Sequence, residues 1–242
     1  MVTKIKSFLL KPTTIAFVLS LLVIWFLPDI FSKYQIELVE SGTIDNKNDL
    51  RIYSYDMDGD GFSEKILSFE HNGNHSLQLI TYDGGIIEQW NTDGIIAGKG
   101  ERLTVGDYDE DGYNEIYTYY QRGDSVFHYC IEPLDTISPI KYENKLITTL
   151  SHQYGVPKYY IDNIIFRDIN DDRYSDLFFT INSGKSKIPR NLFIYDIAND
   201  NLLISDNYGS TLHYGVKLID MDHDGRLEIS GCMIAPGQIA DT

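Results

Sequence analysis

Four short acidic segments contain the side chains in this sequence that are most able to do chemistry. Each nine-residue segment has Asp at position 1, Asp or Asn at position 3, Asp at position 5, and Asp or Glu at position 9. We call these segments loop 1 (56–64), loop 2 (107–115), loop 3 (168–176) and loop 4 (220–228). Their candidate metal ligands are Asp56, Asp58, Asp60 and Glu64; Asp107, Asp109, Asp111 and Glu115; Asp168, Asn170, Asp172 and Asp176; Asp220, Asp222, Asp224 and Glu228.

The spacing of these oxygen-bearing side chains suits calcium. Calcium takes six to eight oxygen ligands, and alternate residues of a curled backbone can point at one ion. Without a cation, the clustered carboxylates of each loop would repel one another. Position 7 can add a backbone carbonyl, so its side chain is free to vary. The residues at this position are Phe62, Tyr113, Tyr174 and Arg226.

Loop 3 is the weakest of the four predicted Ca²⁺ sites. Glycine permits the turn at position 6 in the other loops, as Gly61, Gly112 and Gly225, whereas loop 3 has Arg173 there. Any single loop could be a solvated acidic turn, but four copies in one context favour metal binding. The ions would then act mainly as structural staples.

The EF-hand begins with the same spacing of carboxylates but has further requirements. It needs a helix on each side of the loop and Glu at position 12. The residues at position 12 are Leu67, Thr118, Phe179 and Gly231. Because the flanks are rich in β-branched and aromatic residues, which favour strands, the EF-hand and dockerin interpretations both fail.

Each loop lies between two runs of residues that favour β-strands. The runs before the loops are LRIYSY, RLTVG, IDNIIF and GVKLI, and those after them are KILSF, IYTYY, LFFTI and EIS. In the first three units a turn leads to a third run, SLQLITY, VFHYCI or NLFIYDI, and IIEQW and NLLIS follow as fourth strands. The sequence therefore predicts an all-β chain of four-stranded antiparallel sheets, arranged as the blades of a β-propeller.

The repeats are regular in length but do not make a whole ring. Consecutive loops begin 51, 61 and 52 positions apart, which gives three full units and the start of a fourth. An open propeller leaves sheet edges unpaired, and the strand-prone run YQIELVE could complete one blade only. We therefore expect a fragment of a larger ring, or a ring that another chain completes.

The loops resemble those of the FG-GAP and VCBS repeats of integrin α-subunit-like propellers. That family places a D-x-D/N-x-D-G-x-x-D/E calcium loop between the first two strands of each blade, and the resemblance covers residues 35–242. Its Phe-Gly and Gly-Ala-Pro signatures are poorly matched here, by Val105-Gly106 and by 234–237. The resemblance implies extracellular adhesion, ligand binding or sensing, with a protein or glycan ligand on a propeller face.

The same resemblance leaves two other roles open. The chain could be the recognition ectodomain of a larger sensor receptor, or an accessory module of a carbohydrate-active surface enzyme. It shows no nucleophile elbow and no distinct acid–base pair, so we do not expect an enzyme. His71 and His75 straddle a predicted turn rather than a helix, and the Arg122-Gly123-Asp124 tripeptide is too short a match to carry a function.

Composition excludes one class of partner. The chain has 36 acidic and 20 basic side chains, a formal net charge of −16. Such a surface repels phosphate backbones, so nucleic acid is not an expected partner. The two cysteines, Cys130 and Cys232, allow at most one disulfide, and two buried free thiols are the simpler expectation.

The N-terminal 34 residues have the features of a membrane anchor. Three lysines at positions 4, 6 and 11 precede an uncharged run over 13–27. We expect an uncleaved signal anchor, with a cleaved signal peptide or a buried core helix as alternatives. In the first two cases residues 35–242 lie outside the cytoplasm, where abundant calcium keeps weak sites filled.

Overall fold

A computed structural model of the chain describes residues 12–13, 16–17, 19–20, 48–96, 99–100, 102–135, 137–150, 159–183 and 188–234. Contacts between residues divide the chain into two units, Met1–Asp45 and Asn46–Thr242. The predicted anchor over 13–27 lies mostly outside the described residues, and the run YQIELVE lies wholly outside them. None of the helical segments that the structure describes has the length and apolar character needed to span a bilayer.

Sheet one is an antiparallel meander in which each strand pairs with the next along the chain. Its strands are β1 (Asn48–Tyr55), β2 (Glu64–His71), β3 (Asn74–Ile80) and β4 (Ile86–Asn91). The Asn72-Gly73 pair forms the β2–β3 turn, with φ angles of 52° and 81°. Positive φ at both central residues is the requirement of a type I′ hairpin turn, so the turn chemistry explains this register.

Sheets two and three repeat the same meander and each gain one short strand. The body of sheet two is β7 (Leu103–Gly106), β8 (Glu115–Arg122), β9 (Ser125–Ile131) and β10 (Ile140–Thr149). The body of sheet three is β11 (Tyr159–Arg167), β12 (Asp176–Ser183), β13 (Ile188–Asp196) and β14 (Asn201–Ile204). Strand β5 (Ile95–Ile96) pairs antiparallel with β8, and β6 (Lys99–Gly100) pairs parallel with β11.

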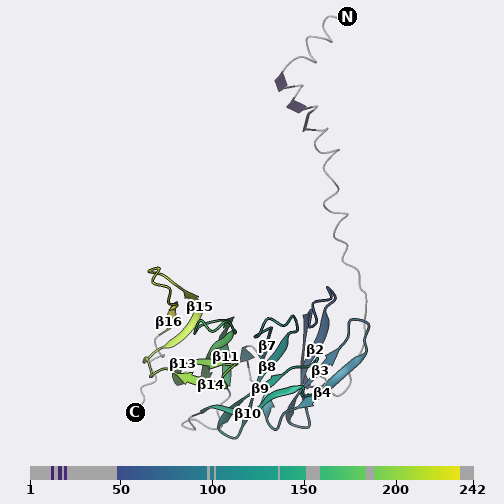
Figure 1. Cartoon of the computed structure of the whole chain (residues 1–242), viewed down its shortest axis with the longest axis vertical. Coiled ribbons are helices and arrows are strands. Elements are labelled where there is room, and N and C mark those ends of the chain that lie inside the picture. Colours follow the sequence, from purple (N-terminus) through teal and green to yellow (C-terminus); the bar gives the residue numbers. More distant parts are fainter. Residues whose placement is uncertain are drawn as a thin grey trace, which may run out of the picture. The chain divides into compact units, whose positions relative to one another are not determined.

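Sheet four contains two described strands, β15 (Thr211–Ile219) and β16 (Glu228–Ile234), which pair antiparallel. Figure 1 shows the four sheets following one another in sequence order. The all-β prediction is confirmed, and so are the four-stranded units. The prediction names no strand at β10, which carries Lys141, Glu143 and Lys145 and shifts register three times against β9. Charges and bulges on this edge strand hide the alternation that reveals a strand.

The hydrophobic core lies between successive sheets. One cluster joins sheets one and two, a second joins sheets two and three, and a third joins sheets three and four. Every residue of β12, and all of β8 except Arg122, is therefore buried, because neighbouring sheets cover both faces. Gly106 of β7 allows the closest approach: a Cβ atom there would lie 2.7 Å from the Phe166 ring of β11.

Candidate metal centres

Each acidic loop joins the first two strands of the antiparallel meander in its sheet, and the same hydrogen-bond pattern recurs in all four loops. The position-1 carboxylate accepts the N–H of position 6 at 2.9–3.0 Å. The position-5 carboxylate accepts the N–H of position 7 at 2.7–2.9 Å. The position-9 carboxylate accepts the N–H of position 2 at 2.6–3.0 Å. The sequence pattern therefore fixes one loop conformation four times.

Three loops bring their predicted ligands together. In loops 2 and 4 all four carboxylates offer one oxygen atom each within 4.8 Å of the others. In loop 1 the group consists of Asp56, Asp58 and Glu64, and Asp60 lies outside it. Within the described residues, loop 3 forms no such group of carboxylates, and its position 3 is Asn170.

Three of the buried carboxylate oxygens have no hydrogen-bond donor. They are Oδ1 of Asp56, Asp109 and Asp176, one each from loops 1, 2 and 3, and no described residue donates to them. Burying a polar atom without a partner costs about 1–3 kcal/mol. A cation bound in the loop would offset that cost, and an all-oxygen ligand set suits a hard cation. The residues of these loops thus fit a calcium ion.

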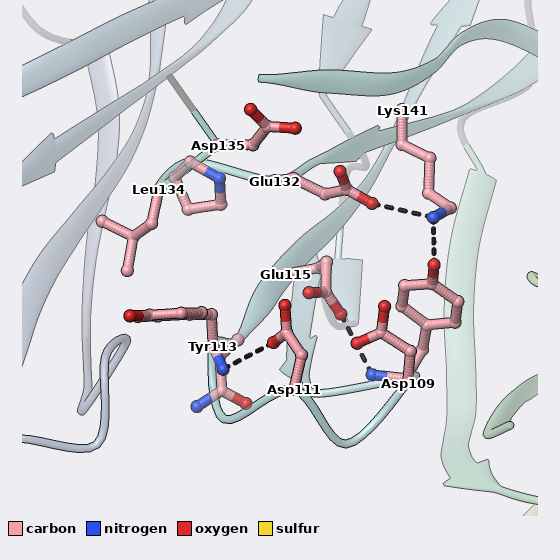
Figure 2. Close-up of a pocket in the computed structure, with 11 residues that line it drawn as sticks. Asp109, Asp111, Tyr113, Glu115, Glu132, Leu134, Asp135 and Lys141 are labelled. Atoms are coloured by element: carbon pink, nitrogen blue, oxygen red, sulfur yellow. Dashed lines mark hydrogen bonds and ion pairs between the residues drawn. The ribbon is translucent and has the colours of Figure 1, made fainter. Parts of the chain in front are cut away.

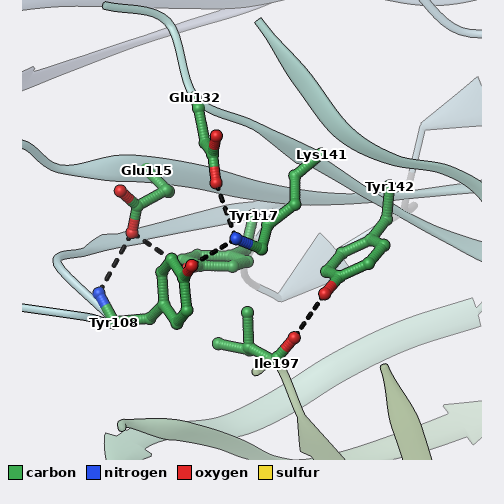
Figure 3. Close-up of polar contacts among 7 residues, drawn as sticks. All are labelled: Tyr108, Glu115, Tyr117, Glu132, Lys141, Tyr142 and Ile197. Atoms are coloured by element: carbon green, nitrogen blue, oxygen red, sulfur yellow. Dashed lines mark hydrogen bonds and ion pairs between the residues drawn. The ribbon is translucent and has the colours of Figure 1, made fainter. Parts of the chain in front are cut away.

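Glu115 connects loop 2 to the core (Figure 3). Its Oε2 accepts hydrogen bonds from the Tyr108 N–H at 3.0 Å and from the Tyr117 hydroxyl at 3.1 Å. Burial is the main cause that raises the pKa of Glu115 to about 7, and the charges of Asp109 and Asp107 add to it. The loop thus holds its carboxylates at a cost in charge repulsion that a divalent cation would relieve.

Loop 2 also borders a pocket of about 350 Å³. Figure 2 shows Asp111 and Tyr113 on one side of this pocket, and Leu134 and Asp135 of the β9–β10 connection on the other. Lys141 lines it too, with its ammonium 2.8 Å from Glu132 and donating to the Tyr108 hydroxyl. Burial lowers the pKa of Lys141, but these two partners outweigh it and raise the pKa above its ordinary value.

Loop 3 departs from the other three at its turn and at position 3. Arg173 adopts φ 78°, close to the 88–93° of the glycines at this position in the other loops. The Asn170 amide donates to Asp172 at 3.1 Å and to Asp196, outside the loop, at 3.2 Å. Burial raises the pKa of Asp176 to about 6, and the charges of Asp196, Asp172 and Asp168 contribute. The sequence pattern contains no signal for Asp196, which follows in β13.

Consecutive loops are joined directly by hydrogen bonds. The backbone N–H of Asn114 in loop 2 donates to the Met57 carbonyl of loop 1 at 2.9 Å, and its side-chain amide donates to the Asp56 carbonyl at 2.8 Å. At the equivalent position of loop 3, the Ser175 N–H donates to the Tyr108 carbonyl of loop 2 at 2.8 Å. Loops 1, 2 and 3 therefore form a continuous edge.

The remaining motifs have structural partners. Arg122 of the Arg-Gly-Asp tripeptide, at the end of β8, forms an ion pair at 2.9 Å with Asp93 of the β4–β5 connection. His75 is buried and lies 3.1 Å from the Ser68 hydroxyl, whereas His71 is exposed beside Asn72. The two cysteines are free, as expected, but the expectation that both are buried is wrong for Cys232, which is exposed.

A scan of the chain against protein-family models found no match, and searches of curated proteins and of solved structures found none either. The resemblance to FG-GAP and VCBS repeats thus rests on the loop residues and their place between strands.

Proposed function

We propose that this chain is a calcium-stabilised β-propeller module that binds a ligand. The observation that carries the proposal is the hydrogen-bond pattern repeated in all four loops. In three of these loops, three or four carboxylates each place an oxygen atom within 4.8 Å of the others. Oxygen-only ligands favour calcium over zinc, which takes nitrogen and sulfur. The loops contain no His or Cys apart from His223, which is not among the predicted ligands.

The order of the sheets supports the propeller arrangement. In each sheet an acidic loop joins the first two strands of the meander, and successive sheets pack together through shared cores. Calcium at each loop would brace the edge at which loops 1, 2 and 3 are hydrogen-bonded to one another. A membrane-anchored, extracytoplasmic location agrees with the lysines before the run over 13–27 and with the calcium supply of that compartment.

Ligand binding, for adhesion or sensing, is the role that we propose for this module. The pocket beside loop 2 combines Tyr113 and Leu134 with Asp135 and Lys141. Apolar contacts with a few convergent charged groups are the usual composition of a binding site.

Calcium binding is tested by thermal unfolding of the full chain with excess calcium and with chelator. We expect calcium to raise the melting temperature, since a site saturated at a hundredfold excess over Kd contributes about 2.7 kcal/mol. Asp58→Ala and Asp109→Ala should each remove part of the increase. The exposed Asp206, outside the loops, provides the control variant Asp206→Ala.

Terbium luminescence provides a second readout, because Tyr108 and Tyr113 lie within loop 2 and can sensitise a bound lanthanide. If neither the melting temperature nor the luminescence responds to cation, the proposal is wrong.

A further inference from the structure

At the four ligand positions, loop 3 has one carboxylate fewer than the other loops. Positions 1, 3, 5 and 9 are all acidic in loops 1, 2 and 4, whereas loop 3 has Asn170 at position 3. Its position 9 is Asp176, whose side chain is one methylene shorter than the Glu of the other loops. Because calcium affinity depends on the number of charged ligands, loop 3 alone would form the weakest site.

Asp196 lies beside loop 3 and brings a further carboxylate to it from β13. It is the last residue of β13 and is 8 % exposed. Its Oδ2 lies 3.2 Å from the Asn170 side-chain nitrogen, which is also 3.1 Å from Asp172 Oδ2. The Asn199 side-chain nitrogen spans the same two residues, 3.3 Å from Asp172 and 3.0 Å from Asp196. Asp172 and Asp196 therefore face one another across two amides.

A second, independent observation at loop 3 is a buried carboxylate oxygen without a donor. Asp176 is only 1 % exposed, and its Oδ2 accepts the Ile169 N–H at 2.9 Å. Its Oδ1 is buried, and none of the described residues donates a hydrogen bond to it. A buried carboxylate oxygen without a donor is costly unless a cation binds it. Neither amide satisfies this atom, since both donate to Asp172 and Asp196 instead.

We propose that Asp196 is the fourth carboxylate ligand of the third calcium site, replacing the one that Asn170 lacks. The inference rests on the proposed calcium binding of the loops and extends it to a residue that the loop pattern does not contain. The third site is then a composite of loop 3 and the end of β13. Its number of carboxylate ligands then equals the four that the sequence pattern predicts for each of the other three loops.

Asp196 also has a structural role, which the test must separate from ligation. Its Oδ1 accepts the Asn199 backbone N–H at 3.0 Å and so holds the β13–β14 turn. Asp196→Asn keeps an acceptor and the shape of the side chain but removes the charge. Asn170→Asp in the same chain would restore four carboxylates without restoring Asp196, so the double variant distinguishes a ligand from a turn residue.

The experiment counts calcium ions bound per full chain by native mass spectrometry and measures their affinities by calorimetry. We expect four ions for the wild-type chain and three for Asp196→Asn, or one site weakened by about tenfold or more. Asn170→Asp/Asp196→Asn should bind four again. Asp206→Asn, the same chemical change outside the loops, should match the wild type.

Each other outcome has one meaning. A wild-type chain that binds no calcium contradicts the proposed function itself. A chain that binds calcium elsewhere but loses no ion and no affinity in Asp196→Asn contradicts the role of Asp196. If the wild-type chain and Asp196→Asn both bind three ions, loop 3 binds no ion and the amides alone hold its conformation. This result also overturns the inference. If Asp196→Asn misfolds and the double variant does not recover both the fold and the fourth ion, Asp196 is a turn residue only.

Discussion

At the residue scale, loop 3 differs from the other loops in placing a side chain at position 6, where the backbone is left-handed. Position 6 lies at φ 88–93° in the three loops that have glycine there, and Arg173 adopts 78° at the same position. A side chain with a Cβ atom is strained in this region by about 1 kcal/mol, and glycine is not. The hydrogen bond from Arg173 N–H to Asp168, at 2.9 Å, holds the residue there.

Replacing Arg173 by glycine should stabilise the protein. We expect Arg173→Gly to raise the free energy of unfolding in chelator by about 0.5–1 kcal/mol, because it relieves the strain at an exposed position. Arg226→Gly is the matched control: it removes the same exposed side chain from loop 4, at a position without positive φ. Urea denaturation measures both. Stabilisation by Arg226→Gly but not by Arg173→Gly would contradict the argument.

At the scale of elements, loops 1, 2 and 3 are attached to one another by hydrogen bonds. Each position-9 carboxylate fixes the position-2 N–H of its own loop, and the carbonyls of Met57 and Tyr108, also at position 2, accept from the next loop. An ion bound in one loop would therefore also order the acceptor on which the following loop depends. This linkage explains why the acidic loops form one edge rather than separate turns.

The link between loops 1 and 2 can be weakened without removing a ligand. Asn114→Ala deletes the 2.8 Å hydrogen bond to the Asp56 carbonyl and keeps the backbone bond to Met57. We expect a loss of about 1 kcal/mol in the free energy of unfolding. Ser175→Ala, at the equivalent position of loop 3, deletes no hydrogen bond to loop 2 and should have a smaller effect. Equal urea midpoints for the two variants would contradict this.

At the scale of the whole molecule, aromatic rings pack between sheets two and three. His128 of β9 is fully buried against Tyr119 of β8 and Tyr195 of β13, with ring centroids 4.8 and 5.1 Å away. Burial lowers the pKa of His128 to about 3, while the charge of Asp200 opposes this shift and Lys145 adds to it. The core of sheets two and three therefore holds a neutral imidazole.

This histidine makes stability depend on pH. The unfolded chain binds a proton at His128 below about pH 6.5, and the folded chain does so only near pH 3. Its contribution is therefore fully present above 6.5 and is lost as pH falls, by about 1.4 kcal/mol per pH unit. His128→Phe should flatten the stability profile between pH 6.5 and 4. If the stability profiles of His128→Phe and the wild type run parallel after normalisation at pH 8, the prediction is wrong.

The sequence by itself determined the loops and most of the strands. Both depend on interactions over a few residues: carboxylates that accept N–H groups within their own loop, and β-prone runs joined by turns such as Asn72-Gly73. Local chemistry of this kind is readable because the backbone brings the groups together whatever the rest of the chain does.

Only the tertiary structure decided which distant groups join these loops. Asp196 reaches loop 3 because β13 pairs with β12, and Lys141 reaches Glu132 and Tyr108 from β10, a strand whose charges conceal it in the sequence. Strands β5 and β6 pair with two different sheets and are each two residues long. Such contacts are set by strand pairing and packing between sheets, so no local pattern of residue types encodes them.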